Sequence, residues 1–187
     1  MVKIPPFLTA PAWANNDVDV YHGTLDLYAT SIRRSINPSL GNPRTDFGLG
    51  FYTTTILRQA RAWAWQMAID YNALTPVPPR LANPVVVRFR VPRDELASLE
   101  WLVFARGDSG HSDYWSFVQY CRSGGHAHGR RTPPNMSPWY DGVAGPVAAF
   151  WRTRLAISNS DQFSFHTPKA AAILDRSRKR VLKVSMR

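Results

Sequence analysis

The chain has 187 residues, of which 44% are hydrophobic and 19% charged, so it can bury a sizeable core and is not a disordered protein. Its formal net charge is +10. This surplus fits an anionic partner, such as nucleic acid, an acidic protein or a phosphate-bearing ligand, and it equally fits a basic globular protein with no such partner.

The chain begins with a segment rich in proline, alanine and asparagine, which predicts an extended lead-in over residues 1–17 and a single domain over residues 18–187. This segment has no apolar run of the length found in secretory signals, and no stretch of about 18 apolar residues could span a membrane. We therefore expect a protein without a membrane partner. It would be cytoplasmic, or delivered into a target cell without a cleaved signal peptide.

Strands and helices alternate in the first part of the chain. Alternating apolar and polar residues predict a strand over residues 18–22, and an apolar stripe predicts a helix over residues 25–36. Prolines and asparagines over residues 37–44 predict a loop. A second strand is expected over residues 51–55, followed by a helix over residues 56–72 with Thr55 as its N-cap.

The second part of the chain consists mainly of strands, with short helices between them. We expect strands over residues 85–91, 101–105, 140–147, 162–166 and 180–184, and helices over residues 92–96, 112–122 and 169–174. Residues 123–138 predict a surface loop. The order of the elements predicts an α+β fold with a mixed or split antiparallel sheet.

Several common site motifs are absent from the sequence. It contains no Walker A loop, no GxGxxG after a strand, no HExxH and no GxSxG. The single Cys121 excludes a cysteine-cluster metal site. His126 and His128, with His111 earlier in the chain, are spaced wrongly for one helical face, so we predict no metal site.

Two short segments place polar and aromatic side chains where strands end. They read YHGT at residues 21–24 and GFYTT at residues 50–54, with a predicted helix and loop between them. In this order they resemble the His and Tyr motifs of the diphtheria-toxin-like ADP-ribosyltransferases, the group that includes the poly-ADP-ribose polymerases. Trp63 follows Tyr52 after ten residues, as does the second aromatic of the diphtheria-type pattern.

Longer stretches extend the resemblance. Residues 45–54, 140–148 and 161–167 are similar to a bacterial family of uncharacterised proteins assigned to the same fold, and the likeness covers about residues 18–175. It implies an ADP-ribosyltransferase-like split antiparallel or mixed sheet with flanking helices. It also implies NAD as co-substrate, bound by His22, Gly23, Thr24, Tyr52, Thr53 and Trp63.

The resemblance also implies a role for each of these positions. His22 would bind the adenosine-side ribose, and the Gly23 backbone would bind the nicotinamide carboxamide. Tyr52 and Trp63 would sandwich the nicotinamide ring between flat aromatic faces. Thr53 would bind the amide or order the wall. Taken singly, a histidine such as His22 is usually a satisfied structural residue, and Trp63 fits core packing as well as it fits stacking.

The third motif departs from the known pattern. Well-known members carry a glutamate on a later strand, where it binds the ribose 2′-OH and orients a nucleophile. Here Gln162 opens the strand at that place, with Asp161 as the alternative. Glutamine can donate and accept hydrogen bonds but cannot act as a base. Elongation of a polymer is therefore not expected, and His22, Tyr52 and Gln162 are the catalytic residues predicted for transfer of a single ADP-ribose.

The sequence thus predicts a mono-ADP-ribosyltransferase that acts on a macromolecule, in the manner of a bacterial toxin or effector with an immunity or antitoxin partner. The net charge, with Arg130, Arg131 and the basic residues 176–180, favours RNA or DNA over protein as the acceptor. Three alternatives stay open: an NAD glycohydrolase, a catalytically inactive module that binds NAD or nucleic acid, and a nucleic-acid-binding protein unrelated to NAD.

Overall fold

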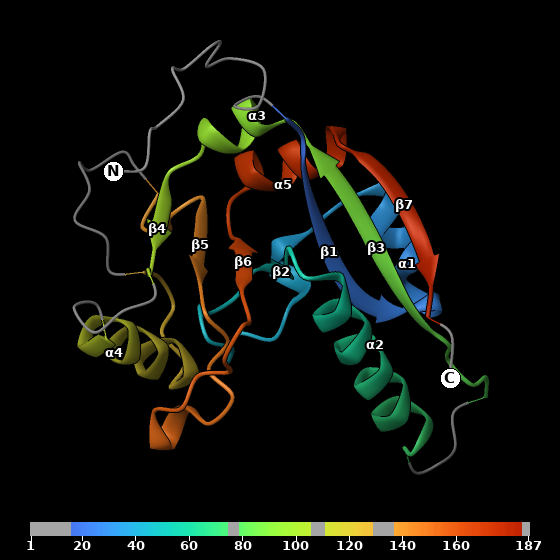
Figure 1. Cartoon of the computed structure of the whole chain (residues 1–187), viewed down its shortest axis with the longest axis horizontal. Coiled ribbons are helices and arrows are strands. Elements are labelled where there is room, and N and C mark those ends of the chain that lie inside the picture. Colours follow the sequence, from blue (N-terminus) through green and yellow to red (C-terminus); the bar gives the residue numbers. More distant parts are fainter. Residues whose placement is uncertain (1–15, 75–78, 106–110, 129–136, 185–187) are drawn as a thin grey trace, which may run out of the picture.

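Two β-sheets lie side by side in the molecule, with helices packed around them (Figure 1). The computed structural model describes residues 16–74, 79–105, 111–128 and 137–184, so most of the expected lead-in and the pair Arg130 and Arg131 lie outside the described residues. Over the described ranges the chain forms five α-helices and two sheets, which confirms the predicted α+β class. None of the described helices is long and apolar enough to cross a membrane.

The elements lie close to their predicted positions. The strands are β1 (Val18–Leu25), β2 (Phe51–Thr53), β3 (Pro84–Val91), β4 (Trp101–Val103), β5 (Gly142–Gly145), β6 (Gln162–Phe165) and β7 (Arg178–Lys183). The helices are α1 (Asp26–Arg34), α2 (Leu57–Asn72), α3 (Arg93–Ala97), α4 (His111–Arg122) and α5 (Pro168–Arg176).

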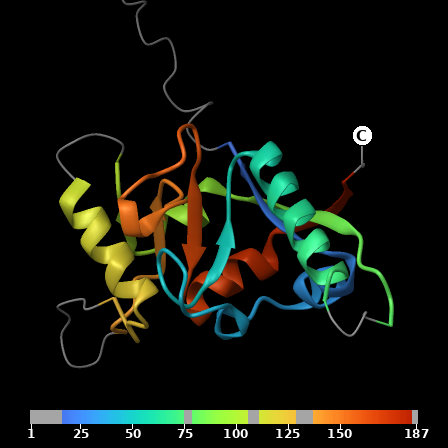
Figure 2. The ribbon, with the colours of Figure 1, turned by 90° about the horizontal axis from the view of Figure 1, so that it is seen from below.

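The first sheet has the antiparallel order β1-β3-β7. Because side chains alternate between the two faces of a strand, Val20, Val87 and Phe89 share one face and form the main core with α1 and α5. The opposite face receives α2. Figure 2 shows α2 on one side of this sheet and α1 with α5 on the other.

The second sheet has the order β2-β6-β5-β4 and is mixed, as predicted. The pairs β2–β6 and β5–β6 are antiparallel, whereas β4–β5 is parallel. Helix α4 lies in the connection between β4 and β5, as a parallel pair requires a crossover. Its residues Tyr114 and Val118 pack with Phe47 and Val143 into a second core cluster.

One residue pair joins the two sheets. The backbone N–H of Tyr21 donates to the Thr54 carbonyl at 2.8 Å, and the N–H of Thr54 donates to the Tyr21 carbonyl at 2.9 Å. No other described pair links the sheets through backbone hydrogen bonds. The YHGT and GFYTT segments therefore meet at this bridge, which we call the junction.

The start of α2 corrects one prediction. Its N-cap is Ile56, and no side chain caps it from that position. Thr55 does not cap the helix because its hydroxyl and its N–H both bind the Asp161 carboxylate. The hydroxyl of Thr54 instead accepts a hydrogen bond from the N–H of Ile56 at 3.0 Å.

Candidate functional site

His22 lies on β1 beside the junction, and its side chain reaches across to β2. Its Nδ1 is 2.7 Å from the Tyr52 carbonyl oxygen, and the imidazole stacks on Phe51 with ring centroids 4.4 Å apart. Because a carbonyl oxygen can only accept, Nδ1 carries the proton. Burial lowers the pKa of His22 below its ordinary value, although the bond to Tyr52 acts the other way. The neutral ring then presents Nε2 as an acceptor, and no described residue donates to it.

Gly23 lies where β1 touches α2. A Cβ at this position would lie 2.2 Å from the Ala60 carbonyl oxygen and 3.0 Å from the Ala64 nitrogen, so no side chain fits. The backbone groups of Tyr21 point to Thr54, and those of Gly23, two residues further, point to the same edge of β1. Gly23 therefore offers one donor and one acceptor at an edge where β2 forms no hydrogen bond to it.

Tyr52 holds the loop that precedes it. Its hydroxyl is 2.7 Å from Thr45 Oγ1, 2.7 Å from the Gly48 carbonyl oxygen and 3.0 Å from the Phe47 nitrogen. Its ring stacks on Phe47 at a centroid distance of 6.4 Å. Burial raises the pKa of this hydroxyl, which therefore stays protonated. The hydroxyl is thus engaged within the protein, and only the ring of this half-buried side chain is left to contact a ligand.

Two predicted binding residues have buried side chains. Thr24 and Thr53 are almost fully buried, and the Thr53 hydroxyl donates to the Phe163 carbonyl on β6 at 3.3 Å. Their side chains therefore support the strands from inside. Only their backbone groups could face a ligand.

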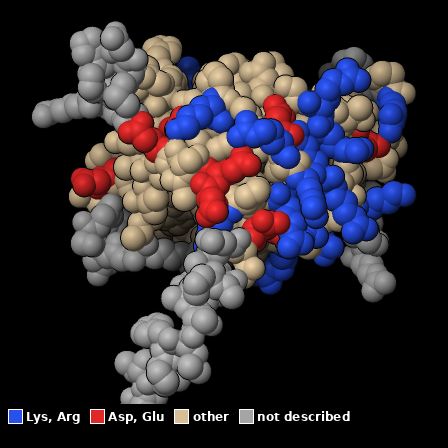
Figure 3. All heavy atoms as spheres, turned by 90° about the horizontal axis from the view of Figure 1, so that it is seen from above, with Lys and Arg blue, Asp and Glu red and all other residues tan. Residues whose placement is uncertain are grey.

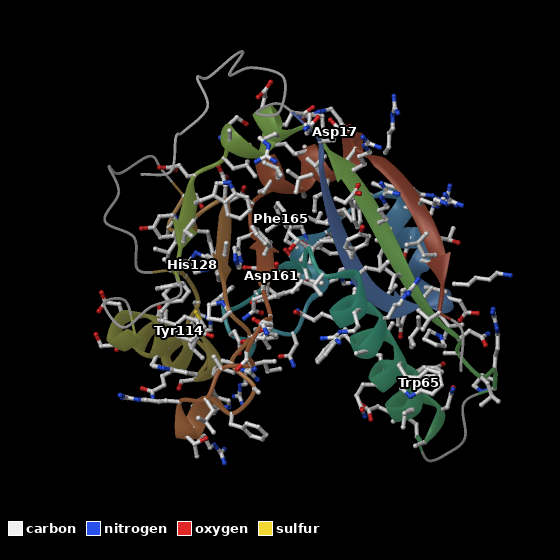
Figure 4. All side chains as sticks on the ribbon, in the orientation of Figure 1. Asp17, Trp65, Tyr114, His128, Asp161 and Phe165 are labelled. Carbon is white, nitrogen blue, oxygen red and sulfur yellow. The ribbon has the colours of Figure 1, made fainter. Side chains whose placement is uncertain are left out.

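Trp63 lies on α2 between the two alanines that pack against Gly23, and the residue is 63% exposed. The interpretation of Trp63 as a core residue is therefore wrong. Trp65, two positions further along the middle of the helix, is half-buried and lies about 200° around the helix axis from Trp63 (Figure 4). The exposed indole of Trp63, on the helix that packs against Gly23, is available for stacking.

Gln162 belongs to a buried polar network. Its Nε2 donates to Asp46 Oδ2 at 2.7 Å and to the Pro146 carbonyl at 2.8 Å, and only 8% of the residue is exposed. Asp46 also accepts from Arg122 at 2.5 Å and from the Ala148 nitrogen at 2.8 Å. The Gln162 amide therefore ties β6 to α4 and to the chain after β5.

Asp161 lies where β2, β6 and α2 meet (Figure 4). Its carboxylate accepts hydrogen bonds from the Thr54 hydroxyl, the Thr55 N–H and the Thr55 hydroxyl. The Gln59 side chain bonds both backbone groups of Asp161, at 2.7 and 3.2 Å. This carboxylate beside the first turn of α2 is favoured by the helix dipole. Nothing in the sequence links Gln59 to a residue 102 positions away.

Two histidines stiffen the loop before β2. His128 Nε2 is 3.0 Å from the Phe47 carbonyl oxygen, and His166 Nδ1 is 2.8 Å from the Leu49 carbonyl oxygen. Burial lowers the pKa of His128 to about 4. Burial, together with the neighbouring His128, lowers the pKa of His166 to about 3. His128 was expected in a surface loop; it is buried because it binds this backbone. Among the described residues, no group of His, Cys, Asp or Glu is arranged to hold a metal ion.

A family described as "Protein of unknown function (DUF3990)" matches residues 18–175. The chain belongs to this family. The matched region runs from the start of β1 into α5, so the junction, Trp63 and Asp161 all lie within it. No curated protein and no solved structure matches the chain.

Proposed function

We propose that this member of the DUF3990 family has an ADP-ribosyltransferase-like fold, binds NAD at the junction and transfers a single ADP-ribose to a macromolecular acceptor. The observation that carries the proposal is the state of His22. Its Nδ1–H donates a hydrogen bond to the Tyr52 carbonyl oxygen. Its Nε2 is therefore a hydrogen-bond acceptor, and no described residue donates to it. An accepting nitrogen suits a ribose hydroxyl, which can donate to it.

The surroundings of His22 supply the remaining contacts for the nicotinamide end. A carboxamide has a donor NH₂ and an acceptor oxygen, and the edge of β1 at Gly23 offers a matching acceptor and donor. The exposed Trp63 provides a flat face for the pyridinium ring, whose positive charge strengthens such stacking. The half-buried ring of Tyr52 forms the other wall.

The reaction breaks the bond between the nicotinamide nitrogen and ribose C1′. The bonding electrons leave with nicotinamide, and an oxocarbenium-like centre develops on the ribose. We assign Asp161 as the group that stabilises this positive charge, because its carboxylate is held at the junction by Thr54 and Thr55. The acceptor oxygen or nitrogen then attacks C1′ with its lone pair, and the proton that it loses goes to solvent.

Gln162 is a weaker choice for this role. Both hydrogen bonds from its NH₂ group are used by Asp46 and the Pro146 carbonyl. Asp161 itself already accepts three hydrogen bonds, so its carboxylate is engaged within the protein and is not positioned by these contacts to activate an acceptor. Transfer to an acceptor that is already a good nucleophile fits this arrangement, and chain elongation does not.

The same hydrogen bonds favour a second function. If neither Asp161 nor Gln162 leaves its protein partners, the junction would bind NAD without turnover. Binding of NAD with no release of nicotinamide over hours distinguishes this module from a transferase. Free ADP-ribose as the sole product distinguishes a glycohydrolase, in which water replaces the acceptor.

The test is incubation with NAD labelled in its adenosine half and separate pools of RNA, DNA and protein. We expect nicotinamide release and transfer of label to one pool. His22→Ala removes one hydrogen bond worth about 1 kcal/mol, so NAD should bind about fivefold more weakly. His126→Ala is the matched control, because His126 is exposed on the loop after α4. Absence of binding, release and transfer would refute the proposal.

A further inference from the structure

Four arginines lie on one face of the first sheet. The register pairs Arg88 with Arg180 and Arg90 with Arg178 across β3 and β7. Residues directly opposite each other point to the same face, so the four guanidinium groups share it. Along each strand the two arginines are two residues apart, or about 7 Å. We call this surface the arginine face.

The charge of this face is only partly compensated. Asp19 binds Arg88 through both Nε and Nη2, at 2.9 and 2.7 Å, and Asp17 binds Arg90 at 2.9 Å. Arg178 and Arg180 are exposed and have no carboxylate partner among the described residues. Like charges opposite each other destabilise a sheet. The fold therefore carries a positive surplus here that its packing does not require.

The arginine face borders the junction. Helix α2 covers the other end of the same sheet face, where Gly23 meets Ala60. Tyr21 is opposite Arg88 in the register and forms the bridge to Thr54. Figure 3 shows lysine and arginine side chains gathered over the end of the molecule that carries this sheet. A long polyanion on the arginine face would therefore pass close to the junction.

We propose that the arginine face binds the phosphate backbone of a nucleic acid. Guanidinium groups bind phosphate oxygens in a bidentate manner, and two parallel rows of them suit a regularly charged strand. An acidic protein fits less well, because protein interfaces rely on buried aromatic or apolar anchors. None of the exposed large hydrophobic side chains among the described residues belongs to β1, β3 or β7.

This inference concerns binding alone and does not rest on the NAD chemistry. The test measures fluorescence anisotropy of a labelled DNA duplex, and separately of RNA, without NAD and over a range of salt. The variant is Arg178→Ala with Arg180→Ala. Arg33→Ala with Arg34→Ala is the control, because it removes the same charge from exposed positions of α1, on the other side of the sheet.

Each phosphate contact contributes about 0.9 to the slope of log affinity against log salt for duplex DNA. The variant lacks two such contacts, so the magnitude of its slope should be smaller by about 1.8 than that of wild type. It should bind about 60-fold more weakly at 0.1 M salt, with the difference vanishing towards 1 M. The control should stay close to wild type, and thermal melts should show that both variants are folded.

Several outcomes would overturn the inference: no binding by wild type, an equal loss in the control, or tighter binding of an acidic peptide than of nucleic acid. His22→Ala should bind nucleic acid as wild type does. If the protein binds nucleic acid but not NAD, the inference about the arginine face is supported and the proposed function is refuted. If the protein turns over NAD while the arginine variant binds nucleic acid normally, the proposed function is supported and the inference about the arginine face is refuted.

Discussion

Replacement of Gly23 by alanine tests whether the spacing between β1 and α2 sets the candidate site. The new Cβ would lie 2.2 Å from the Ala60 carbonyl oxygen and 3.0 Å from the Ala64 nitrogen. Both atoms belong to the backbone of α2, so no side chain can rotate away. The contact can be relieved only if helix and strand move apart by about 1.2–1.8 Å, which is the difference between 2.2 Å and an ordinary van der Waals contact of about 3.4–4 Å.

The cost follows from this geometry. Overpacking costs about 1–3 kcal/mol in typical cores, and a clash with helix backbone belongs at the upper end. For a chain of this size, about 3 kcal/mol lowers the melting temperature by roughly 6–12 °C. Separation of α2 from β1 also moves Trp63 away from the Gly23 edge. NAD binding should therefore weaken even below the melting transition.

The assay is thermal unfolding followed by NAD titration at a temperature where the variant is folded. Gly145→Ala is the matched control, since its Cβ would meet Phe47 Cζ at 3.1 Å and Phe104 Cβ at 3.2 Å, both much longer contacts than the 2.2 Å at Gly23. A Gly23→Ala protein that melts within about 2 °C of wild type would refute the reasoning. Unchanged NAD binding in a destabilised variant would refute the link between helix spacing and the site.

Three further results are expected. Asp46→Asn should destabilise the fold by about 3–5 kcal/mol in urea unfolding, because it leaves the Arg122 guanidinium without its buried partner; an effect under 1 kcal/mol would contradict this. The free energy of unfolding should fall as pH drops from 6.5 towards 5, by up to about 2 kcal/mol each for His128 and His166. The reason is that their lowered pKa values keep both histidines neutral in the folded protein, while the same histidines in the unfolded chain take up protons. His128→Phe should make the free energy of unfolding less dependent on pH. Asp161→Asn should leave NAD binding nearly unchanged and slow nicotinamide release on the order of 100-fold; equal rates would remove Asp161 from the mechanism.

Local sequence signals predicted the elements well. The alternation at β1 and β6, the apolar stripes of α1 and α2, and the Thr167-Pro168 start of α5 were all readable, because each depends on neighbouring residues. The Thr167 hydroxyl accepts from the Ala170 nitrogen. The mixed second sheet also followed from the order of elements. Such features need no knowledge of distant contacts.

Long-range polar contacts could not be read from the sequence. Threonine is a favourable N-cap residue, yet the hydroxyl and the N–H of Thr55 both donate hydrogen bonds to Asp161, which is 106 positions away. Gln162 opens β6 as predicted, but Asp46 holds its amide inside the protein. In both cases a partner brought close only by the fold outcompeted the local preference.

The charge pattern shows a further limit of the sequence. Net charge was compatible with an anionic partner, but it could not show whether the basic residues gather or scatter. The β3–β7 register places Arg178 and Arg180 opposite two other arginines. A shift of one residue would have turned Arg178 and Arg180 to the core face. The arginine face therefore depends on the pairing register of β3 and β7, which cannot be predicted from short segments of sequence.

Direct titration of NAD by calorimetry tests the central claim, which is that the junction of the two sheets binds NAD beside His22 and Trp63. Wild type should bind NAD, and Trp63→Ala should weaken binding by roughly 5- to 150-fold, the equivalent of about 1–3 kcal/mol of stacking. Trp65→Ala, which removes a half-buried indole from a different side of the same helix, should bind as wild type does. No NAD binding by wild type, or equal binding by the Trp63→Ala protein, would contradict the account.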